Sequence, residues 1–156
     1  VVGIPDLPGK AAELFNVVAE AGANIDMIVQ NTATGVDVDD KVSDISFTLP
    51  KGDAAKVVAA LESKQASLGY RELEVDHEIG KISVVGAGMR THSGVSATLF
   101  NALAKAGINI EMISTSEIRI SVVTDIDEAD DAARAIHTAF GLDSDIEAVV
   151  YAGTGR

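Results

Sequence analysis

Residues 9–28 read GKAAELFNVVAEAGANIDMI, and residues 94–113 read GVSATLFNALAKAGINIEMI. The two stretches start 85 positions apart and share twelve of their twenty residues. A self-match at a fixed offset indicates two copies of one supersecondary unit. In each copy, apolar residues at three- and four-residue spacing predict a helix. A Gly followed by Asn-Ile-(Asp/Glu)-Met-Ile then predicts the end of that helix and the start of a strand.

The patterns around the repeat extend each copy to the element order βαββαβ. For the first copy we expect a strand over 1–4, a helix over 10–21, strands over 25–29 and 42–49, a helix over 53–61 and a strand at Leu73 and Val75. For the second copy we expect a strand from Lys81, a helix over 95–106, strands over 110–114 and 118–124, a helix over 128–140 and a strand over 146–151. The second hairpin loop is ten residues shorter, since residues 45–46 match residues 120–121 at an offset of 75.

This order is that of the ferredoxin-like folds, in which helices cover one face of an antiparallel sheet. We therefore predict an α+β chain of two tandem ferredoxin-like domains, residues 1–79 and 80–156. The last strand can pair in either sheet, because exchange between copies is feasible in this topology. Residues 1–3 match only the end of residues 81–86, so we expect a trimmed start or preceding protein.

The composition excludes several classes of function. Twelve basic and twenty-four acidic residues give a net charge of −12, which repels nucleic acid and anionic membranes. The absence of cysteine rules out disulfides, thiolate zinc sites and thiol nucleophiles. No apolar run approaches the ~18 to 20 residues of a membrane span, and no signal peptide is present. We expect a cytoplasmic protein with no nucleic-acid or membrane partner.

Motifs for catalysis or cofactor binding are incomplete. Residues 83–88 resemble the opening of a dinucleotide fingerprint, but Thr91 stands where its third glycine belongs. The three histidines lie far apart and have no ligand at metal-binding spacing, and the Asp-rich loop 37–40 lacks the Gly and terminal Glu of a calcium loop. We therefore predict no catalytic residues, no metal site and no cofactor.

The remaining candidate site is the turn before the first helix of each copy. Residues 6–11 and 89–95 both contain a Gly that lets backbone approach closely as a helix opens. The free N–H groups and the positive end of a helix at such a turn favour a carboxylate. The alternative interpretation is that Gly9 and Gly94 only serve the turn.

An amino acid ligand also carries an ammonium group, which needs acceptors nearby. The side chains of Asp6 and Gln30 and the carbonyls around Asn24 or Asn109 are the candidates for that role. The alternative is that Asn24 and Asn109 only cap the entry of a strand.

Two features of the chain resemble a known family. Pro8-Gly9 before a helix, followed by Ala-Gly-x-Asn-Ile-(Asp/Glu)-Met-Ile, resembles the ACT domain, a small-molecule sensing module of amino acid metabolism. Residues 24–31, 84–89 (VVGAGM), 109–121 (NIEMISTSEIRIS) and 150–156 (VYAGTGR) are similar to the regulatory region of aspartate kinase, and the likeness covers essentially the whole chain. The family's kinase domain is absent. The resemblance implies a chain that does not catalyse by itself but belongs to an ATP-dependent kinase of aspartate, as a separate small subunit or an excised region.

The resemblance also implies an effector site where the first copy of one chain meets the second copy of another. Its residues are Asp6, Gly9, Lys10, Ala11, Asn24, Ile25, Asp26 and Gln30 from the first copy, with Asn109 and Ile110 from the partner. A related second site uses Met89, His92, Gly94 and Val95, although family members usually have Pro in place of Ser93. Lys10 is variable, so we expect only its backbone to take part.

The implied function is end-product control of aspartyl phosphate formation by threonine, with lysine as a further effector, in a homodimer that binds a catalytic alpha subunit. The alternative is an assembly module that holds kinase subunits together without sensing a ligand. Asp6 and Gln30 have no acidic or amide equivalent in the second copy, where Arg90 or Thr91 and Thr115 stand. The first copy is therefore the better candidate sensor.

Overall fold

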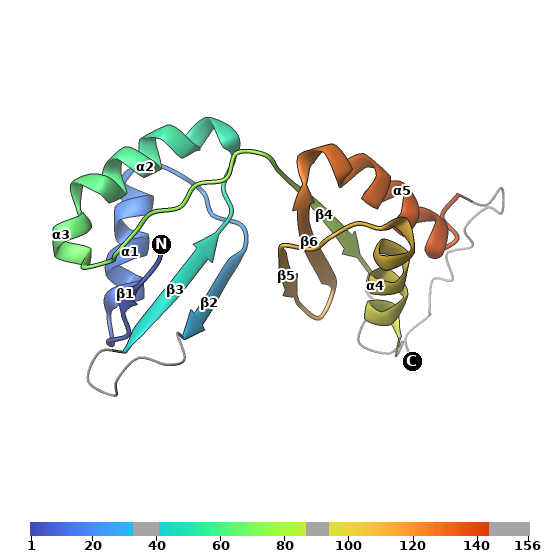
Figure 1. Cartoon of the computed structure of the whole chain (residues 1–156), viewed down its shortest axis with the longest axis horizontal. Coiled ribbons are helices and arrows are strands. Elements are labelled where there is room, and N and C mark those ends of the chain that lie inside the picture. The colour runs from blue at the N-terminus through green and yellow to red at the C-terminus, as the bar shows by residue number, and fades with distance from the viewer. Residues whose placement is uncertain (33–40, 87–93, 144–156) are drawn as a thin grey trace, which may run out of the picture. The chain divides into compact units, whose positions relative to one another are not determined.

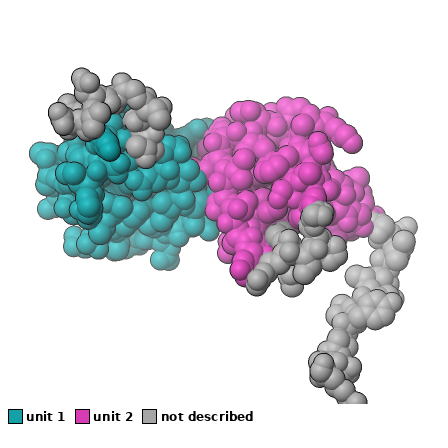
Figure 2. Space-filling view, turned by 90° about the horizontal axis from the view of Figure 1, so that it is seen from below, with its two compact units in different colours: residues 1–78 teal, residues 79–156 magenta. Residues whose placement is uncertain are grey.

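The computed structural model describes residues 1–32, 41–86 and 94–143 of the 156-residue chain. The chain divides into two compact units, Val1–Glu78 and Ile79–Arg156, which Figure 2 shows in teal and magenta. Each unit is described here by itself. Within the described residues, no helix combines the length and the apolar character needed to cross a bilayer.

The first unit is a three-stranded antiparallel sheet with its helices on one face (Figure 1). Its elements are β1 (Ile4–Pro5), α1 (Lys10–Glu20), β2 (Ile28–Thr32), β3 (Val42–Phe47), η1 (Lys51–Asp53), α2 (Ala54–Ser63) and α3 (Gln65–Leu68). The strand order is β1-β3-β2, so β2 is an outer strand. Leu14 and Val18 of α1 pack on Ile45 of β3 and on Val57 and Leu61 of α2 in one core.

The second unit repeats this arrangement. Its elements are β4 (Ile79–Val85), α4 (Val95–Ala106), β5 (Met112–Thr115), β6 (Arg119–Asp125), η3 (Ile126–Glu128) and α5 (Ala129–Ala139), and its strand order is β4-β6-β5. Ile28 pairs with Phe47 in the first sheet, and Ile113 pairs with Val122 in the second. Ile113 stands 85 positions after Ile28, and Val122 stands 75 positions after Phe47. The two units therefore have the same hairpin register, and the predicted α+β fold of two tandem ferredoxin-like domains is confirmed.

The first helix of each unit ends in the same way. Gly22 and Gly107 follow α1 and α4 in the left-handed conformation, with φ of 69° and 75°. Gly22 N–H donates to Ala19 O at 2.9 Å, and the N–H of the next residue reaches back five residues to Val18 O at 3.4 Å. Gly107 and its successor make the equivalent bonds at 3.1 and 3.0 Å. This Schellman motif confirms the helix end predicted from Ala-Gly.

Two predicted strands of the first copy differ from the structure. The strand expected over 25–29 begins only at Ile28. The residues before it both donate to Thr48 in place of regular strand pairing: Asp26 N–H donates to Thr48 O at 3.0 Å, and Met27 N–H donates to Thr48 Oγ1 at 3.1 Å. The strand expected at Leu73 and Val75 is reduced to a single bridge between Val2 and Glu72. Beyond it the chain leaves the sheet, and the Val75 side chain is 45% exposed.

The strand expected over 146–151 lies outside the described residues, as does most of the loop expected over 31–41. The other predicted elements are present, with ends that differ by a few residues. The 3-10 turns η1 and η3 precede α2 and α5 and were not predicted separately.

Candidate functional site

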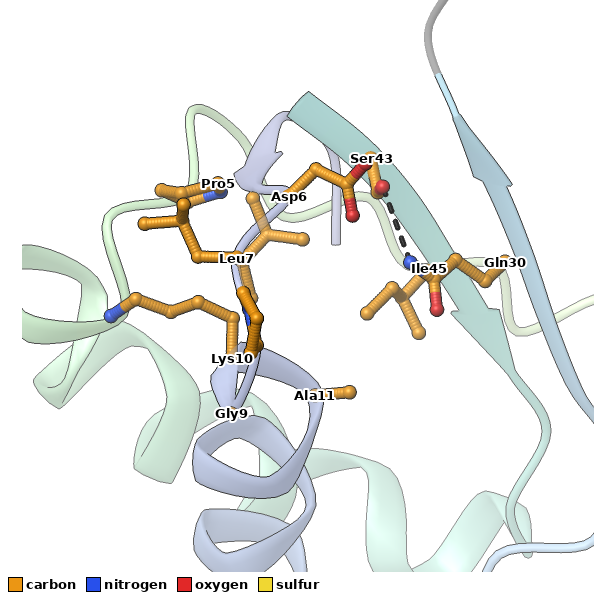
Figure 3. A pocket seen from close by; sticks show the side chains of 11 residues that line it. Pro5, Asp6, Leu7, Gly9, Lys10, Ala11, Gln30, Ser43 and Ile45 are labelled. Carbon is orange, nitrogen blue, oxygen red and sulfur yellow. Dashed lines mark hydrogen bonds between the residues drawn. The ribbon is translucent and has the colours of Figure 1, made fainter. Parts of the chain in front are cut away.

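A pocket of about 370 Å³ lies between the turn that opens α1 and strands β2 and β3 of the first unit (Figure 3). Its lining combines the backbone of a helix start, three polar side chains and a small apolar surface. The lining residues are Ile4, Pro5, Asp6, Leu7, Pro8, Gly9, Lys10, Ala11, Gln30, Ser43 and Ile45. The pocket thus joins the predicted turn 6–11 to Gln30, which stands some twenty residues later in the chain.

Gly9 shapes the turn at the mouth of α1. It is the N-cap residue, with φ 97° and ψ −20°, a left-handed conformation that glycine adopts without steric penalty. No side chain caps this helix end within the described structure. Gly9 O accepts the first helical bond, from Glu13 N–H at 2.9 Å. Lys10 N–H donates to Leu7 O at 3.1 Å, and the next N–H groups of α1 have no acceptor within the helix, so the positive end of the helix dipole lies at the pocket.

The polar side chains of the pocket come from three different segments. Asp6 follows β1 and is half-buried, and its N–H is anchored to Lys41 O at 2.9 Å. Gln30 lies in the middle of β2, directly across from Ile45 in β3. Its Nε2 donates to the hydroxyl oxygen of Ser43 at 3.2 Å, the bond drawn in Figure 3. The pocket therefore offers a carboxylate and an amide oxygen opposite the helix start.

The Lys10 side chain points away from this polar group (Figure 3). Its Nζ donates to Glu13 Oε2 at 2.7 Å and to the carbonyl of Ser67 in α3 at 3.0 Å. Lys10 therefore joins the start of α1 to α3, and its own N–H donates to Leu7 O at 3.1 Å within the turn. The backbone role expected for Lys10 stays a prediction.

The other residues of the predicted site lie elsewhere in their units. Asn24, Ile25 and Asp26 follow the opposite end of α1, and an 11-residue helix rises about 16 Å. They do not line the pocket of their own unit. Asn109 and Ile110 occupy the equivalent place after α4 in the second unit. Their predicted roles depend on a second chain and stay predictions.

The second predicted turn is only partly described. Met89 and His92 lie outside the described residues, whereas Gly94 is the N-cap of α4 and Val95 its first residue. Gly94 has φ 100° and ψ −8°, nearly the conformation of Gly9. The two copies thus share the geometry of the helix start. The described parts of the chain contain no cluster of His, Cys, Asp or Glu that suits a metal ion.

Ser43, Ile45 and Ile4 line the pocket but were not predicted as site residues. The loop between the paired strands differs in length between the copies, so the register of Gln30 against β3 was not available from the repeat alone. The alternation of Ser43, Ile45 and Phe47 was the usable signal, because residues two apart in a strand share one face. That pattern places Ser43 on the same face as the core residue Ile45.

Comparison with known proteins gives consistent matches. The profile of the ACT domain family matches residues 1–65 and 82–140. An aspartokinase from Mycolicibacterium smegmatis is 52% identical over all 156 residues, and one from Corynebacterium glutamicum is 47% identical over the same length. The chain spans 36% of the length of each of these two relatives.

Solved structures match the whole fold. One, described as aspartokinase alpha and beta subunits, is 43% identical with a TM-score of 0.80, and the match covers 90% of this chain and 89% of the other. The ligand-free regulatory subunit of aspartate kinase from Thermus thermophilus is 41% identical with a TM-score of 0.79, over 89% of this chain and 88% of that one.

Proposed function

Since this chain belongs to the ACT domain family, we propose that it is a non-catalytic allosteric module of aspartate kinase that binds an end-product amino acid. Threonine is the first candidate effector, and lysine is the second. The observation that carries the proposal is the pocket at the start of α1, where a helix end without a side-chain cap lies beside Asp6 and Gln30. The kinase it controls phosphorylates aspartate with ATP at the first step toward lysine, threonine and methionine.

The pocket suits both charged groups of a free amino acid. A carboxylate is stabilised by the N–H groups and the positive dipole end of α1. An ammonium group has the Asp6 carboxylate and the Gln30 amide oxygen as acceptors. Ile4, Ala11 and Ile45 supply a small apolar surface for a short side chain. A pocket of about 370 Å³ holds a molecule the size of threonine with room for a partner chain to close it.

We further propose that the site is completed in a homodimer by Asn109 and Ile110 of a partner chain. Strands β2 and β5 are outer strands of their sheets. Ile28 of β2 and Ile113 of β5 are equivalent in the repeat and are 50% and 44% exposed. A ligand that contacts two chains favours the paired state, and this difference in affinity can bias an attached kinase.

The catalytic partner is proposed from the relatives. The curated aspartokinases extend well beyond the matched 36% of their length, and one similar structure is described as containing alpha and beta subunits. We therefore propose that this chain acts with a kinase domain, either on a catalytic alpha subunit or in a longer chain.

The exposed pair Ile28 and Ile113 also favours a second candidate, an assembly module without a ligand. Calorimetric titration with threonine and then lysine separates the two. Sensing predicts saturable binding and an unfolding free energy about 2.7 kcal/mol higher at 100 times the dissociation constant. Pure assembly predicts a stable dimer by light scattering that no amino acid alters.

A matched pair of variants ties binding to the pocket. We expect Asp6→Asn to weaken threonine binding, because it removes the negative charge that faces the ammonium group. Asp130→Asn makes the same change on the exposed first turn of α5 and should leave binding unaltered. Equal affinity in both variants would reject this pocket as the effector site.

A further inference from the structure

Ser43 is a buried hydroxyl on the strand side of the pocket. It lies in β3, where its backbone pairs with Ile4 on one side and Thr32 on the other, and it is only 1% exposed. A buried hydroxyl costs free energy unless it is hydrogen-bonded. The recorded partner of its side chain is the Gln30 amide, at 3.2 Å. The most deeply buried polar side chain of the pocket is thus committed to holding another pocket residue.

Gln30 needs such a partner to keep one orientation. It lies on the outer strand β2, and its side chain is exposed. An exposed glutamine has several rotamers, and its amide has an acceptor on one side and donors on the other. Because Nε2 is directed at Ser43, Oε1 is left as the acceptor. The bond to Ser43 thus holds the amide in an orientation that leaves Oε1 unbound to Ser43.

We propose that Ser43 is a positioning residue for ammonium recognition: its hydroxyl oxygen accepts from Gln30 Nε2, so that Oε1 is directed to accept from the ligand's ammonium group. This inference rests on the proposed amino acid binding and identifies how one contact of that site is oriented. A reversed amide would direct its N–H groups at the ammonium and repel it. The hydroxyl acts through Gln30 and has no contact with the ligand of its own.

The second unit lacks this pair. The repeat places Thr115 at the position of Gln30 and Ile118 at that of Ser43, and Ile118 is 52% exposed. Neither position carries an amide. We therefore expect ammonium recognition by this arrangement only in the first unit.

The test compares threonine with 2,3-dihydroxybutanoate, which keeps the carboxylate and side chain but has a hydroxyl in place of the ammonium. We expect Ser43→Ala to weaken threonine binding about fivefold, the factor that corresponds to one ordinary hydrogen bond. Binding of the dihydroxy acid should stay unchanged, and Ser43→Thr should restore threonine affinity. In a Gln30→Ala background, Ser43→Ala should have no further effect, since the two residues act as one unit.

Ser121→Ala is the matched control. Ser121 is a buried strand serine, 3% exposed, whose hydroxyl lies 2.8 Å from that of Ser83 in the second unit. Its substitution should leave threonine affinity as in the wild type. Gln30→Leu is a second probe, which removes the amide at an exposed position of an outer strand. It too should weaken threonine but not the dihydroxy acid.

The outcomes are distinct. If the wild-type chain binds neither threonine nor lysine, the proposed function itself fails. If threonine binds and Ser43→Ala weakens both ligands equally, Ser43 is only part of the pocket's structure and the inference is overturned. Equal weakening of both ligands by Gln30→Leu overturns it as well.

Discussion

Gly80 is the position where one added methyl group should disturb the second unit most. It is buried in β4, across from Thr124, and a Cβ built on it would lie 2.5 Å from Ala129 Cβ at the start of α5. Ordinary contacts of this kind are about 3.4 to 4 Å, so the strand and helix must separate by about 1 Å or more. Overpacking of a well-packed site costs about 1 to 3 kcal/mol. We expect Gly80→Ala to lose stability in that range, with a melting temperature lower by about 4 to 8 °C per kcal/mol for a unit of this size.

Urea unfolding followed by hydrogen exchange of β4 and α5 measures this effect in the unit concerned. Gly52→Ala is the control, because a Cβ there meets nothing within 4 Å and its φ is not positive. The double variant Gly80→Ala/Ala129→Gly removes the second methyl group of the clash, so the two changes should couple favourably. A Gly80→Ala protein within about 0.5 kcal/mol of the wild type would refute the reasoning, since that range is typical of harmless surface changes.

Two further predictions concern the first unit. Gly9→Ala forces a residue with a Cβ into φ 97°, which costs about 1 to 2 kcal/mol and alters the helix start. Both the unfolding free energy, measured by urea titration, and the threonine affinity, measured by calorimetry, should therefore fall. A variant that keeps both values would contradict the assigned turn geometry. Tyr70 is 4% exposed and its hydroxyl has no partner within the described structure, so Tyr70→Phe should not lower stability at neutral pH. Burial first, and the negative charge of Glu62 second, raise the pKa of the Tyr70 phenol above its ordinary 10. The phenol therefore ionises more readily in the unfolded state, and wild-type stability should fall above pH 10 more steeply than that of the Phe variant. Parallel pH profiles of the two proteins would show that Tyr70 does not govern the loss of stability at high pH.

The repeat made the fold predictable because both copies carry the same helix stripe and the same Ala-Gly end. Leu14 and Val18 are fully buried, as their spacing in the stripe implies. The start of β2 was misplaced for a reason outside the local pattern. Thr48, twenty residues away, uses its hydroxyl and carbonyl to hold residues 26 and 27, which otherwise have the composition of a strand.

The candidate site was only partly predictable. The comparison of the two copies pointed to Asp6, Gly9 and Gln30. Gly9 recurs as Gly94, whereas Asp6 and Gln30 have no acidic or amide equivalent in the second copy. Ser43 was not predicted: its alternation with Ile45 places it on the core face, but its bond to Gln30 depends on strand register across a loop whose length differs between the copies. Asn24 follows the end of α1 that lies opposite the pocket, and Asn109 has the equivalent place after α4, so their predicted contribution requires a second chain and stays a prediction.

The helix ends at Gly22 and Gly107 are alike, whereas the turns that precede α1 and α4 differ in sequence. The Schellman motif closes the C-terminal end of α1 with backbone bonds to the last turn of the helix, and the second copy has the same bonds at the end of α4. The N-terminal turn, residues 5–8, lies at the other end and makes its own bonds to Lys41 and within the turn. If the proposed function holds, exchanging the residues of this turn should change ligand preference while the helix end stays as it is. Residues 6–8 and 91–93 differ in sequence whereas Gly22 and Gly107 are the same, so the duplication has kept the helix end constant and let the turn vary.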